Sequence, residues 1–483
     1  MKKLITKAIL IILLFTLNNS FLFSQENKIK LFDEYLNQYL LVKNVPSISA
    51  GLLEQGKIIW LNGLGKADIE NNVPVNQNSI YRIASISKPI TAVAILQLWE
   101  RGLISLDTDA RTYIPSFPVK KYQFTIRQLL NHTSGIRNYK EGEFDSKKYY
   151  ATTDEALKLF AYDSLNFEPG TQYEYTTLGY SLLAAIVESV TKTTFEKYLK
   201  NNVLEQAGMN FTLTDKQSEI ILNRVRGYEK NAESKIVNAP LADLSVKVAG
   251  GGLLSTTKDL LQFAKAILEN KLIKQSTFDM MIRKSRLKSG RELDYGLGFS
   301  LTFENDTLRY ISHNGAGTGF SSMLLIDLKL KNASVHLINI RDRNLGAPAK
   351  DILEMLTSGV QIKPTKTLSE ELMKTYLTAG IDSTIYRLNK IYNLEKDLYT
   401  LNEDEAIFFS KDLIYLNKIP DAVTYLKEIL KIYTKSFKVL VAIGDSYLKD
   451  NNNGLALRYY RLAFQIDSSN NRINNLIKKL SSK

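Results

Sequence analysis

A serine and a lysine three residues apart, Ser85 and Lys88, stand at the start of an apolar run of helical length, Ala92–Leu98. Residues at this spacing share one face of a helix, so the hydroxyl and the amine would be neighbours. Free backbone N–H groups and the dipole at a helix N-terminus favour developing negative charge. The pair could therefore make a nucleophile of the serine. Ser87 competes with Ser85, but its position next to Lys88 points it away from the amine.

A serine hydroxyl attacks efficiently only when a base accepts its proton. Lys88 is one candidate base, if burial lowers its pKa. A tyrosine held near Lys88 is another, because the ammonium would favour the phenolate. The two groups would titrate as a coupled set, so the sequence leaves the proton acceptor open. An ordinary helix N-terminus is the alternative to any chemistry, because Ser-x-x-Lys also arises by chance.

Three further motifs follow this one in the chain and give the pattern its meaning. The four segments are, in order, Ile83-Ala84-Ser85-Ile86-Ser87-Lys88, Leu129-Leu130-Asn131-His132-Thr133-Ser134-Gly135, Pro169-Gly170-Thr171-Gln172-Tyr173-Glu174-Tyr175, and His313-Asn314-Gly315-Ala316-Gly317. Together they resemble the class C β-lactamase-related serine hydrolases, a family of penicillin-binding-protein-like peptidases and esterases. The resemblance covers about residues 30–355, and four ordered motifs are far more specific than one.

The resemblance assigns roles to particular residues of this chain. It implies that Ser85 is the acylated nucleophile, Lys88 its activating partner, and Tyr175 the general base and later the general acid. It also implies an oxyanion hole made by the amide of Ser85 and the amide of Ala316, which follows Gly315. It requires no metal and no organic cofactor.

The second and third motifs each depart from the family pattern at one position. Thr177 stands where asparagine is usual, and one hydroxyl replaces the two N–H donors of a carboxamide. We expect this change to weaken substrate binding and the positioning of Lys88. His313 stands where true β-lactamases have lysine, and an unperturbed histidine is mostly neutral at pH 7. Because a neutral ring binds a carboxylate poorly, we expect weak or no β-lactam hydrolysis.

Composition excludes several other classes of function. The 483 residues are enough for two or three domains, and the charge of +13 is scattered rather than gathered in a patch. This favours a solvated surface and gives no sign of nucleic-acid binding. The absence of cysteine rules out disulfides and thiolate catalysis. The three histidines, of which His132 and His336 read as structural, lack metal-ligand spacing, so no metal site is expected.

Residues 1–24 have the pattern of a secretory signal peptide. Lysines at positions 2, 3 and 7 precede an apolar stretch, Ala8–Leu17, and the small Ser24 could precede the cleavage site. The pattern predicts an exported protein, periplasmic or extracellular. The alternative is an uncleaved segment, which would be the chain's only attachment to a membrane.

The remaining patterns predict an α+β fold in which an antiparallel sheet is flanked by helices, as in β-lactamases and transpeptidases. A helix-like stripe, 27–41, precedes two strand-like runs, 46–53 and 57–65, joined by a Gln55-Gly56 turn. Residues from about 90 to 290 are mostly helical. Strands return over 295–303, 308–313, 319–327 and 334–340, and a helix follows over 347–356. Strands at both ends predict one sheet built from both ends, with a helical insertion.

A second domain follows a linker. We place the hydrolase-like domain at 25–357, the linker at 358–368, and an all-α region at 369–483. Leu440, Ile443, Gly444 and Tyr447, followed by Ala456, match a 34-residue tetratricopeptide pattern. The pattern recurs 34 residues earlier, which predicts stacked helical hairpins that could bind a protein partner.

Two hypotheses of function result. The first is a serine hydrolase that forms an acyl-enzyme with a small ester, amide or peptide, including peptides that contain D-amino acids. The second is a non-catalytic binding, scaffold or sensor protein, in which the helical repeats hold a partner and the hydrolase-like domain is degenerate. Thr177 is the only residue that supports the second.

Overall fold

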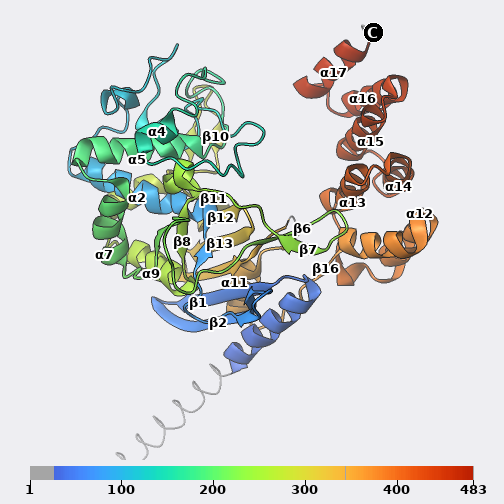
Figure 1. Cartoon of the computed structure of the whole chain (residues 1–483), viewed down its shortest axis with the longest axis horizontal. Helices are drawn as coiled ribbons and strands as arrows, with labels where there is room; N and C mark the ends of the chain where they lie inside the picture. The colour runs from blue at the N-terminus through green and yellow to red at the C-terminus, as the bar shows by residue number, and fades with distance from the viewer. Residues whose placement is uncertain (1–26, 343, 482–483) are drawn as a thin grey trace, which may run out of the picture. The chain divides into compact units, whose positions relative to one another are not determined.

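The computed structural model describes residues 27–342 and 344–481, which form two compact units (Figure 1). The first unit runs to Glu229 and continues over Asn238–Ile362; the second comprises Lys230–Val237 and the chain from Lys363. The predicted signal peptide lies outside the described residues. Within them, no helix is both long and apolar enough to cross a bilayer.

The first unit is built on a seven-stranded sheet in the order β11-β12-β13-β14-β1-β2-β3. Its strands are β1 (Ser47–Glu54), β2 (Lys57–Asp68), β3 (Val73–Pro74), β11 (Ser300–Glu304), β12 (Thr307–Gly317), β13 (Phe320–Asp327) and β14 (Asn332–Ile338). β14 pairs antiparallel with β1, with Ala50 opposite His336, so the N-terminal and C-terminal strands meet in mid-sheet. The predicted sheet, built from both ends around a helical insertion, is confirmed.

Two helices cover opposite faces of this sheet. Neighbouring residues of a strand point to opposite faces. Gly51 of β1 faces α9 (Thr257–Leu268), since a side chain there would lie 2.9 Å from Leu261. On the other face, His336 Nδ1 accepts a hydrogen bond of 3.1 Å from the amide of Ala349 in α11 (Pro348–Ser358). His336 is therefore a bonded core residue, as its position in an apolar strand predicted.

The strand predicted over 295–303 begins later than expected. β11 starts only at Ser300, and Tyr295 makes an isolated bridge to that residue. Gly296 and Gly298 interrupt the strand: Gly298 has a φ of +96°, a backbone conformation that favours glycine. The apolar and aromatic residues of this stretch pack in the interior as a loop. The turn places Tyr295 beside β12, where it enters the site described below.

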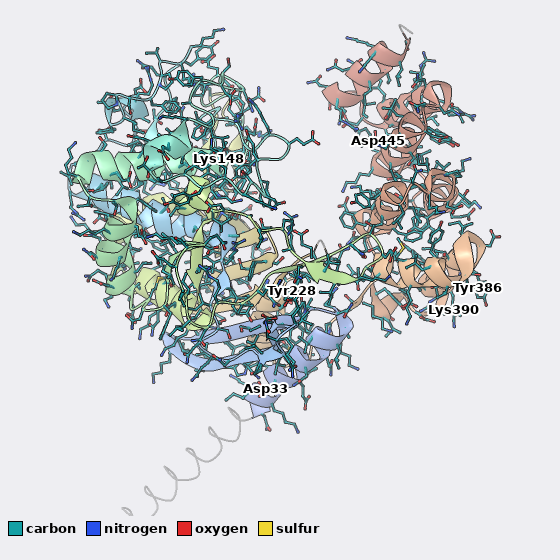
Figure 2. All side chains as sticks on the ribbon, in the orientation of Figure 1. Asp33, Lys148, Tyr228, Tyr386, Lys390 and Asp445 are labelled. Carbon is teal, nitrogen blue, oxygen red and sulfur yellow. The ribbon has the colours of Figure 1, made fainter. Side chains whose placement is uncertain are left out.

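The helical segment 27–42 is attached to β2 by Asp33, which Figure 2 labels. The Asp33 carboxylate accepts hydrogen bonds from Trp60 Nε1 at 2.9 Å and from Asn62 Nδ2 at 2.7 Å. At the opposite side of the segment, the Tyr39 hydroxyl donates to the carbonyl of Leu345 at 2.6 Å. The first helix therefore joins β2 to the segment that precedes α11.

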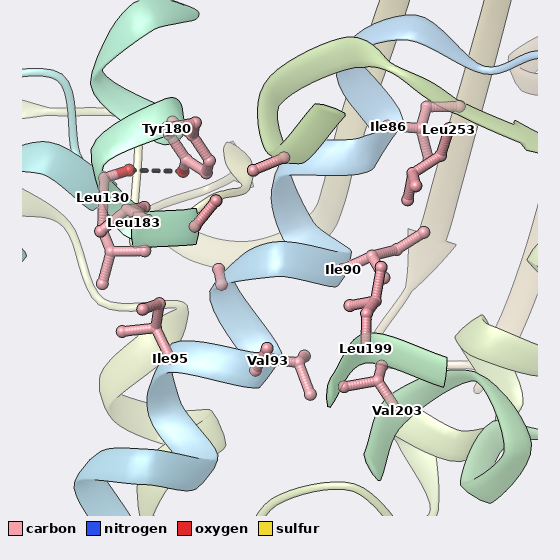
Figure 3. Close-up of a cluster of buried hydrophobic side chains, with 14 of the residues drawn as sticks. Ile86, Ile90, Val93, Ile95, Leu130, Tyr180, Leu183, Leu199, Val203 and Leu253 are labelled. Atoms are coloured by element: carbon pink, nitrogen blue, oxygen red, sulfur yellow. Dashed lines mark hydrogen bonds between the residues drawn. The ribbon is translucent and has the colours of Figure 1, made fainter. Parts of the chain in front are cut away.

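Helix α2 (Ser87–Glu100) runs through the interior of the unit, and most of its residues are buried on every side. Figure 3 shows Ile90 and Val93 among the apolar side chains of neighbouring helices. The adjacent helix α5 (Leu178–Thr191) is fixed by the Tyr180 hydroxyl, which donates to the Leu130 carbonyl at 2.8 Å. Because α2 is enclosed, its N-terminus has a fixed position.

The second unit is mostly helical. Its helices are α12 (Leu368–Leu394), α13 (Glu403–Tyr415), α14 (Ile419–Ile432), α15 (Phe437–Lys449), α16 (Asn453–Ile466) and α17 (Asn471–Ser481). α15 begins 34 residues after α13, and α16 begins 34 residues after α14, the period that the sequence predicts. α12 is interrupted at Gly380, which has a φ of +75°. The helical C-terminal region is confirmed over α13 to α17, whereas Tyr399–Thr400 before it forms a short strand. The tetratricopeptide assignment stays a prediction.

Alanine substitutions at two glycines of this unit are expected to change its stability in opposite directions. A Cβ on Gly444 of α15 would lie 2.6 Å from the Tyr460 ring of α16, whereas Gly454 has open space around it. Gly444→Ala is expected to destabilise the pair by about 1–3 kcal/mol. Gly454→Ala should stabilise it by about 0.5–1 kcal/mol, because alanine restricts the unfolded chain. Hydrogen exchange of the backbone amides of α15 and α16 measures both changes in stability. If both substitutions changed stability in the same direction, the packing described here would be wrong.

Candidate active site

The turn that carries Ser85 is held between a small sheet and the start of α2. Strand β4 (Tyr81–Arg82) pairs with β8 (Leu253–Ser255), and a 3₁₀ turn, Ala84–Ile86, follows at once. Ala84 has a φ of +45°, which is strained for a residue with a side chain. The fixed turn separates Ser85 from the buried residues on either side of it.

Ser87 stabilises this turn rather than facing the amine of Lys88. Its hydroxyl donates to the Ala84 carbonyl at 2.7 Å and accepts from the Leu253 amide at 3.3 Å. Both bonds are buried and join the turn to β8. This leaves Ser85 as the serine beside the lysine.

Lys88 lies fully buried in the first turn of α2, with three oxygen atoms around its amine. Its Nζ is 3.1 Å from Ser85 Oγ, 3.2 Å from Thr177 Oγ1 and 2.6 Å from the Gly250 carbonyl. Burial lowers the pKa of Lys88 well below its ordinary value, and the charge of Lys247 lowers it further. No carboxylate within the described ranges forms an ion pair with this amine.

These contacts match the hydrogen-bonding capacity of a neutral amine. A neutral amine has two N–H donors and one lone pair. The Gly250 carbonyl can only accept, and Thr177 Oγ1 can accept the second N–H. When the amine is neutral, its lone pair faces Ser85 Oγ at 3.1 Å, and the Ser85 hydroxyl can then donate to it. This geometry places a base at the nucleophile's proton.

Tyr175 lies beside the same amine, with Lys88 Nζ 4.7 Å from the centre of its ring. Burial raises the pKa of the Tyr175 phenol, and its interaction with Ser85 opposes the shift without cancelling it. The phenol is therefore protonated at neutral pH and can donate a proton. Of the two candidate bases that the sequence leaves open, the electrostatics favour Lys88.

His313 is buried on β12 and is held by a directed chain of hydrogen bonds. Its Nδ1 contacts the Asn314 carbonyl at 2.7 Å, which can only accept, so Nδ1 carries the proton. Its Nε2 lies 3.0 Å from the Tyr295 hydroxyl. Burial lowers the pKa of His313 to about 3, with a further contribution from Lys88. A neutral His313 accepts at Nε2, so the Tyr295 hydroxyl donates to it.

His132 completes this chain on the other side of Tyr295. Its Nδ1 accepts from the Thr176 amide at 3.2 Å, so its proton is on Nε2, which lies 3.2 Å from the Tyr295 hydroxyl. Burial lowers the pKa of His132 and keeps the ring neutral. The chain therefore runs from His132 through Tyr295 to His313. It joins the loop that carries Tyr175 to strand β12.

Tyr295→Phe tests this chain. The substitution keeps the ring but leaves Nε2 of both histidines without a partner. We expect the free energy of unfolding to fall by about 2 kcal/mol or more. Tyr310→Phe on β12 is the control, because among the described residues no side-chain hydrogen bond is formed by its hydroxyl; its effect should stay within about 0.5 kcal/mol. Equal losses in urea titration would contradict the assigned chain.

Gly315 allows β12 to approach the Ser85 turn closely. A Cβ at this position would lie 2.3 Å from the Ile83 carbonyl and 2.2 Å from Ser322 Oγ, so any side chain would force the two apart. The next residue, Ala316, lines one cavity together with Ser85 and Thr177. The amides of Ser85 and Ala316, expected to form the oxyanion hole, therefore belong to segments on the same cavity.

Several site residues were not identified as such from the sequence. Gly250 accepts from Lys88, and a Cβ there would lie 2.7 Å from Thr177 Cγ2. No motif in the sequence assigns a role to the Gly250-Gly251-Gly252 run. Tyr295 carried no expectation beyond its strand, and His132 was read as structural. The glycines were the available signal, because consecutive glycines mark a close approach of backbone.

The fold and the cluster around Ser85 define a serine hydrolase of the Ser-x-x-Lys type. A family model described as Beta-lactamase matches residues 31–358. The chain therefore belongs to the beta-lactamase family. The human mitochondrial serine beta-lactamase-like protein LACTB is 31% identical over 375 residues, covering 58% of this chain and 68% of that protein. Penicillin-binding protein 4* of Bacillus subtilis is 30% identical over 303 residues, covering 59% and 66%.

Solved structures share the fold of the first unit. The D-amino acid amidase from Ochrobactrum anthropi, complexed with D-phenylalanine, has a TM-score of 0.60 at 22% identity and covers 70% of this chain and 99% of that one. The octameric penicillin-binding protein homologue from Pyrococcus abyssi has a TM-score of 0.59 at 22% identity, covering 72% and 81%. At these identities the likeness shows the fold alone.

Proposed function

We propose that this protein is an exported hydrolase that forms an acyl-enzyme on Ser85 with an ester or amide, including amides of D-amino acids. The observation that carries the proposal is the 3.1 Å contact between Ser85 Oγ and the buried amine of Lys88. The signal-like pattern of residues 1–24 supports export.

In the first step, the Ser85 hydroxyl attacks the substrate carbonyl as its proton passes to Lys88. The new C–O bond displaces the carbonyl π electrons onto oxygen, and the amides of Ser85 and Ala316 stabilise that charge. The resulting ammonium has three N–H donors for the three oxygens around it, those of Ser85, Thr177 and Gly250. The site therefore accepts the proton without rearranging.

In the second step, the tetrahedral intermediate expels its leaving group. The Tyr175 phenol donates a proton to the leaving oxygen or nitrogen, and the Lys88 ammonium restores the phenol's proton. Deacylation repeats the sequence with water, whose proton is accepted as that of Ser85 was. The raised pKa of Tyr175 suits it to the acid role, because the phenol is protonated when the leaving group departs.

Thr177 supports catalysis despite its departure from the family pattern. Its hydroxyl lies 3.2 Å from Lys88 Nζ, so it makes the contact to the lysine that we expected the substitution to weaken. The non-catalytic hypothesis rested on this residue alone. We therefore favour turnover over sensing.

A substrate screen tests the proposed substrate class. We expect hydrolysis of short-chain esters or D-amino-acid amides and slow or no hydrolysis of a cephalosporin reporter. The reason is His313: its pKa of about 3 makes it neutral at pH 7, so the motif position that is lysine in true β-lactamases offers the substrate no charge here. Steady-state kcat/KM for the three substrate types is the measurement. Fastest turnover on the cephalosporin would overturn the substrate assignment.

A further inference from the structure

One wall of the Ser85 cavity carries a buried cation with no assigned role. The wall includes Lys247, Tyr139 and Phe144, together with Ala316 of β12 and Thr318 directly after that strand. Lys247 ends a 3₁₀ turn, Ser245–Lys247, directly before the segment whose Gly250 carbonyl contacts Lys88. Its charge acts on Lys88 strongly enough to lower the pKa of that amine. Lys247 is thus close to the reacting groups without being one of them.

The Lys247 ammonium has spare hydrogen-bonding capacity. Its Nζ donates to the Phe144 carbonyl at 2.6 Å and lies 4.3 Å from the Phe144 ring centre and 5.2 Å from that of Tyr139. Of the three N–H donors of the ammonium, only one makes a conventional hydrogen bond, the bond to the Phe144 carbonyl. Among the described residues, no carboxylate oxygen lies within 4.0 Å of this Nζ. By contrast, Arg82, the other cation of the wall, pairs with Asp215 at 2.6 Å.

The carboxylates whose charge acts on Lys247 are bonded to other groups. Asp145 accepts from the Thr318 hydroxyl and pairs with Arg341 at 3.4 Å, and Asp243 accepts from Ser245. Burial lowers the pKa of Lys247 most, Arg82 and Arg341 lower it further, and these two acids raise it, to a net value of about 8. The side chain is therefore mostly charged at pH 7. A buried, charged and incompletely bonded ammonium is costly unless an anion meets it.

Tyr139 supplies a second, independent observation on the same wall. Its hydroxyl lies toward Thr177 but makes no hydrogen bond of acceptable geometry within the described ranges, although it is buried. Buried hydroxyls are seldom left without a partner. The phenol and the ammonium are both donors, and one acceptor group could satisfy both.

We propose that Lys247 and Tyr139 form a subsite that binds a carboxylate of the substrate, beside the scissile bond held at Ser85. The proposal rests on the proposed hydrolase function and adds a preference within its substrate class, for esters or amides that carry a carboxylate near the scissile bond. The competing explanation is that Lys247 only stabilises its loop through the ring and carbonyl contacts.

Lys120 offers a matched control for that explanation. Its Nζ lies 5.1 Å from the Phe117 ring centre and donates to the Asp163 carbonyl at 2.6 Å, but it does not line the Ser85 cavity. Lys120→Met therefore removes the same kinds of contact at a distance from the site. It reports what the loss of such a lysine does to the fold alone.

Three esters separate charge recognition from general activity. They are 4-nitrophenyl butyrate, which is neutral; mono-4-nitrophenyl glutarate, with a carboxylate on the acyl chain; and 3-(butanoyloxy)benzoate, with one on the leaving group. The measured quantity is the ratio of kcat/KM for a carboxylated ester to kcat/KM for the neutral ester. For at least one of the two carboxylated esters, we expect Lys247→Met to lower this ratio by about tenfold or more. Lys247→Arg should retain most of the ratio, Tyr139→Phe should lower it, and Lys120→Met should leave it unchanged.

The pH dependence of this ratio in the wild type is a further readout. The ratio should fall as the pH rises through about 8, where Lys247 loses its charge. Titration of Lys88 affects all three esters and divides out. If neither Lys247→Met nor Tyr139→Phe changes the ratio, the proposed subsite is wrong. It is also wrong if the wild type has the same kcat/KM for all three esters. If the neutral ester is turned over, the proposed hydrolase stands even where the subsite fails.

Discussion

Lys88→Met is expected to lower kcat/KM for ester hydrolysis by about 10²–10⁴-fold, the usual contribution of a general base. The amine is 3.1 Å from Ser85 Oγ, and methionine fills much of its volume without a lone pair of comparable basicity. In the wild type, kcat/KM should rise with pH as Lys88 is deprotonated. Because burial lowers the pKa of Lys88, that rise lies below the ordinary lysine range. In the Lys88→Met variant, kcat/KM should no longer rise over this pH range.

The same variant should keep or gain stability, which separates lost chemistry from lost fold. Lys88 is protonated in the unfolded chain but neutral in the folded one over the range between its lowered and ordinary pKa. The unfolded state then binds more protons, so this group's contribution to stability rises with pH and is unfavourable at neutral pH. Methionine removes that cost. A thermal midpoint at or above that of the wild type, with activity lost, is the expected pair of results; unchanged activity would exclude Lys88 as the base.

Ser85→Ala is expected to lower turnover by about 10⁴-fold or more, because removal of a nucleophile leaves only the catalysis due to binding and the oxyanion hole. Ser85 is half-buried, and its hydroxyl contacts Lys88, so the fold should tolerate the change. Steady-state hydrolysis of a short-chain ester measures the loss.

Ser87→Ala is the matched control for that variant. It removes a hydroxyl two residues away that bonds the Ala84 carbonyl and the Leu253 amide. We expect it to destabilise the turn and slow the reaction, but to leave a reactive Ser85. If Ser87→Ala abolished turnover and Ser85→Ala retained it, the two serines would have to exchange roles.

The fold was largely predictable because its elements have clear periodic patterns. The Gln55-Gly56 turn and its two strands, the antiparallel strands near the C-terminal end of the unit and the apolar α2 all lie close to their expected positions. The prediction that β11 begins at Tyr295 was wrong, because the apolar and aromatic residues of Tyr295–Phe299 are buried in a loop and not in a strand. Those residues pack as a buried loop around Gly298, and composition alone does not distinguish such a loop from a strand.

The site was predictable only in part, because its contacts join distant parts of the chain. Motif resemblance named Ser85, Lys88 and Thr177. The structure brings Ser85 Oγ and Thr177 Oγ1 within 3.2 Å of Lys88 Nζ. The Gly250 carbonyl lies 162 residues from Lys88, and a backbone oxygen has no residue-type signature. The same holds for Lys247, which looks like any surface lysine until its burial is known.

The C-terminal unit shows what periodicity predicts and what it leaves open. The 34-residue spacing fixed the positions of α13 to α16, and Gly444 is required by the Tyr460 ring. The expected protein partner of these helices remains a prediction, because packing accounts for the repeated residues.

The central claim is that Ser85 forms the covalent acyl-enzyme, and labelling with a fluorophosphonate tests it most directly. Intact-protein and peptide mass spectrometry of the wild type should show one adduct, on the peptide that contains Ser85. Labelling should be slower in Lys88→Met and absent in Ser85→Ala. An unlabelled wild type, or an equal mass shift in Ser85→Ala, would contradict the account.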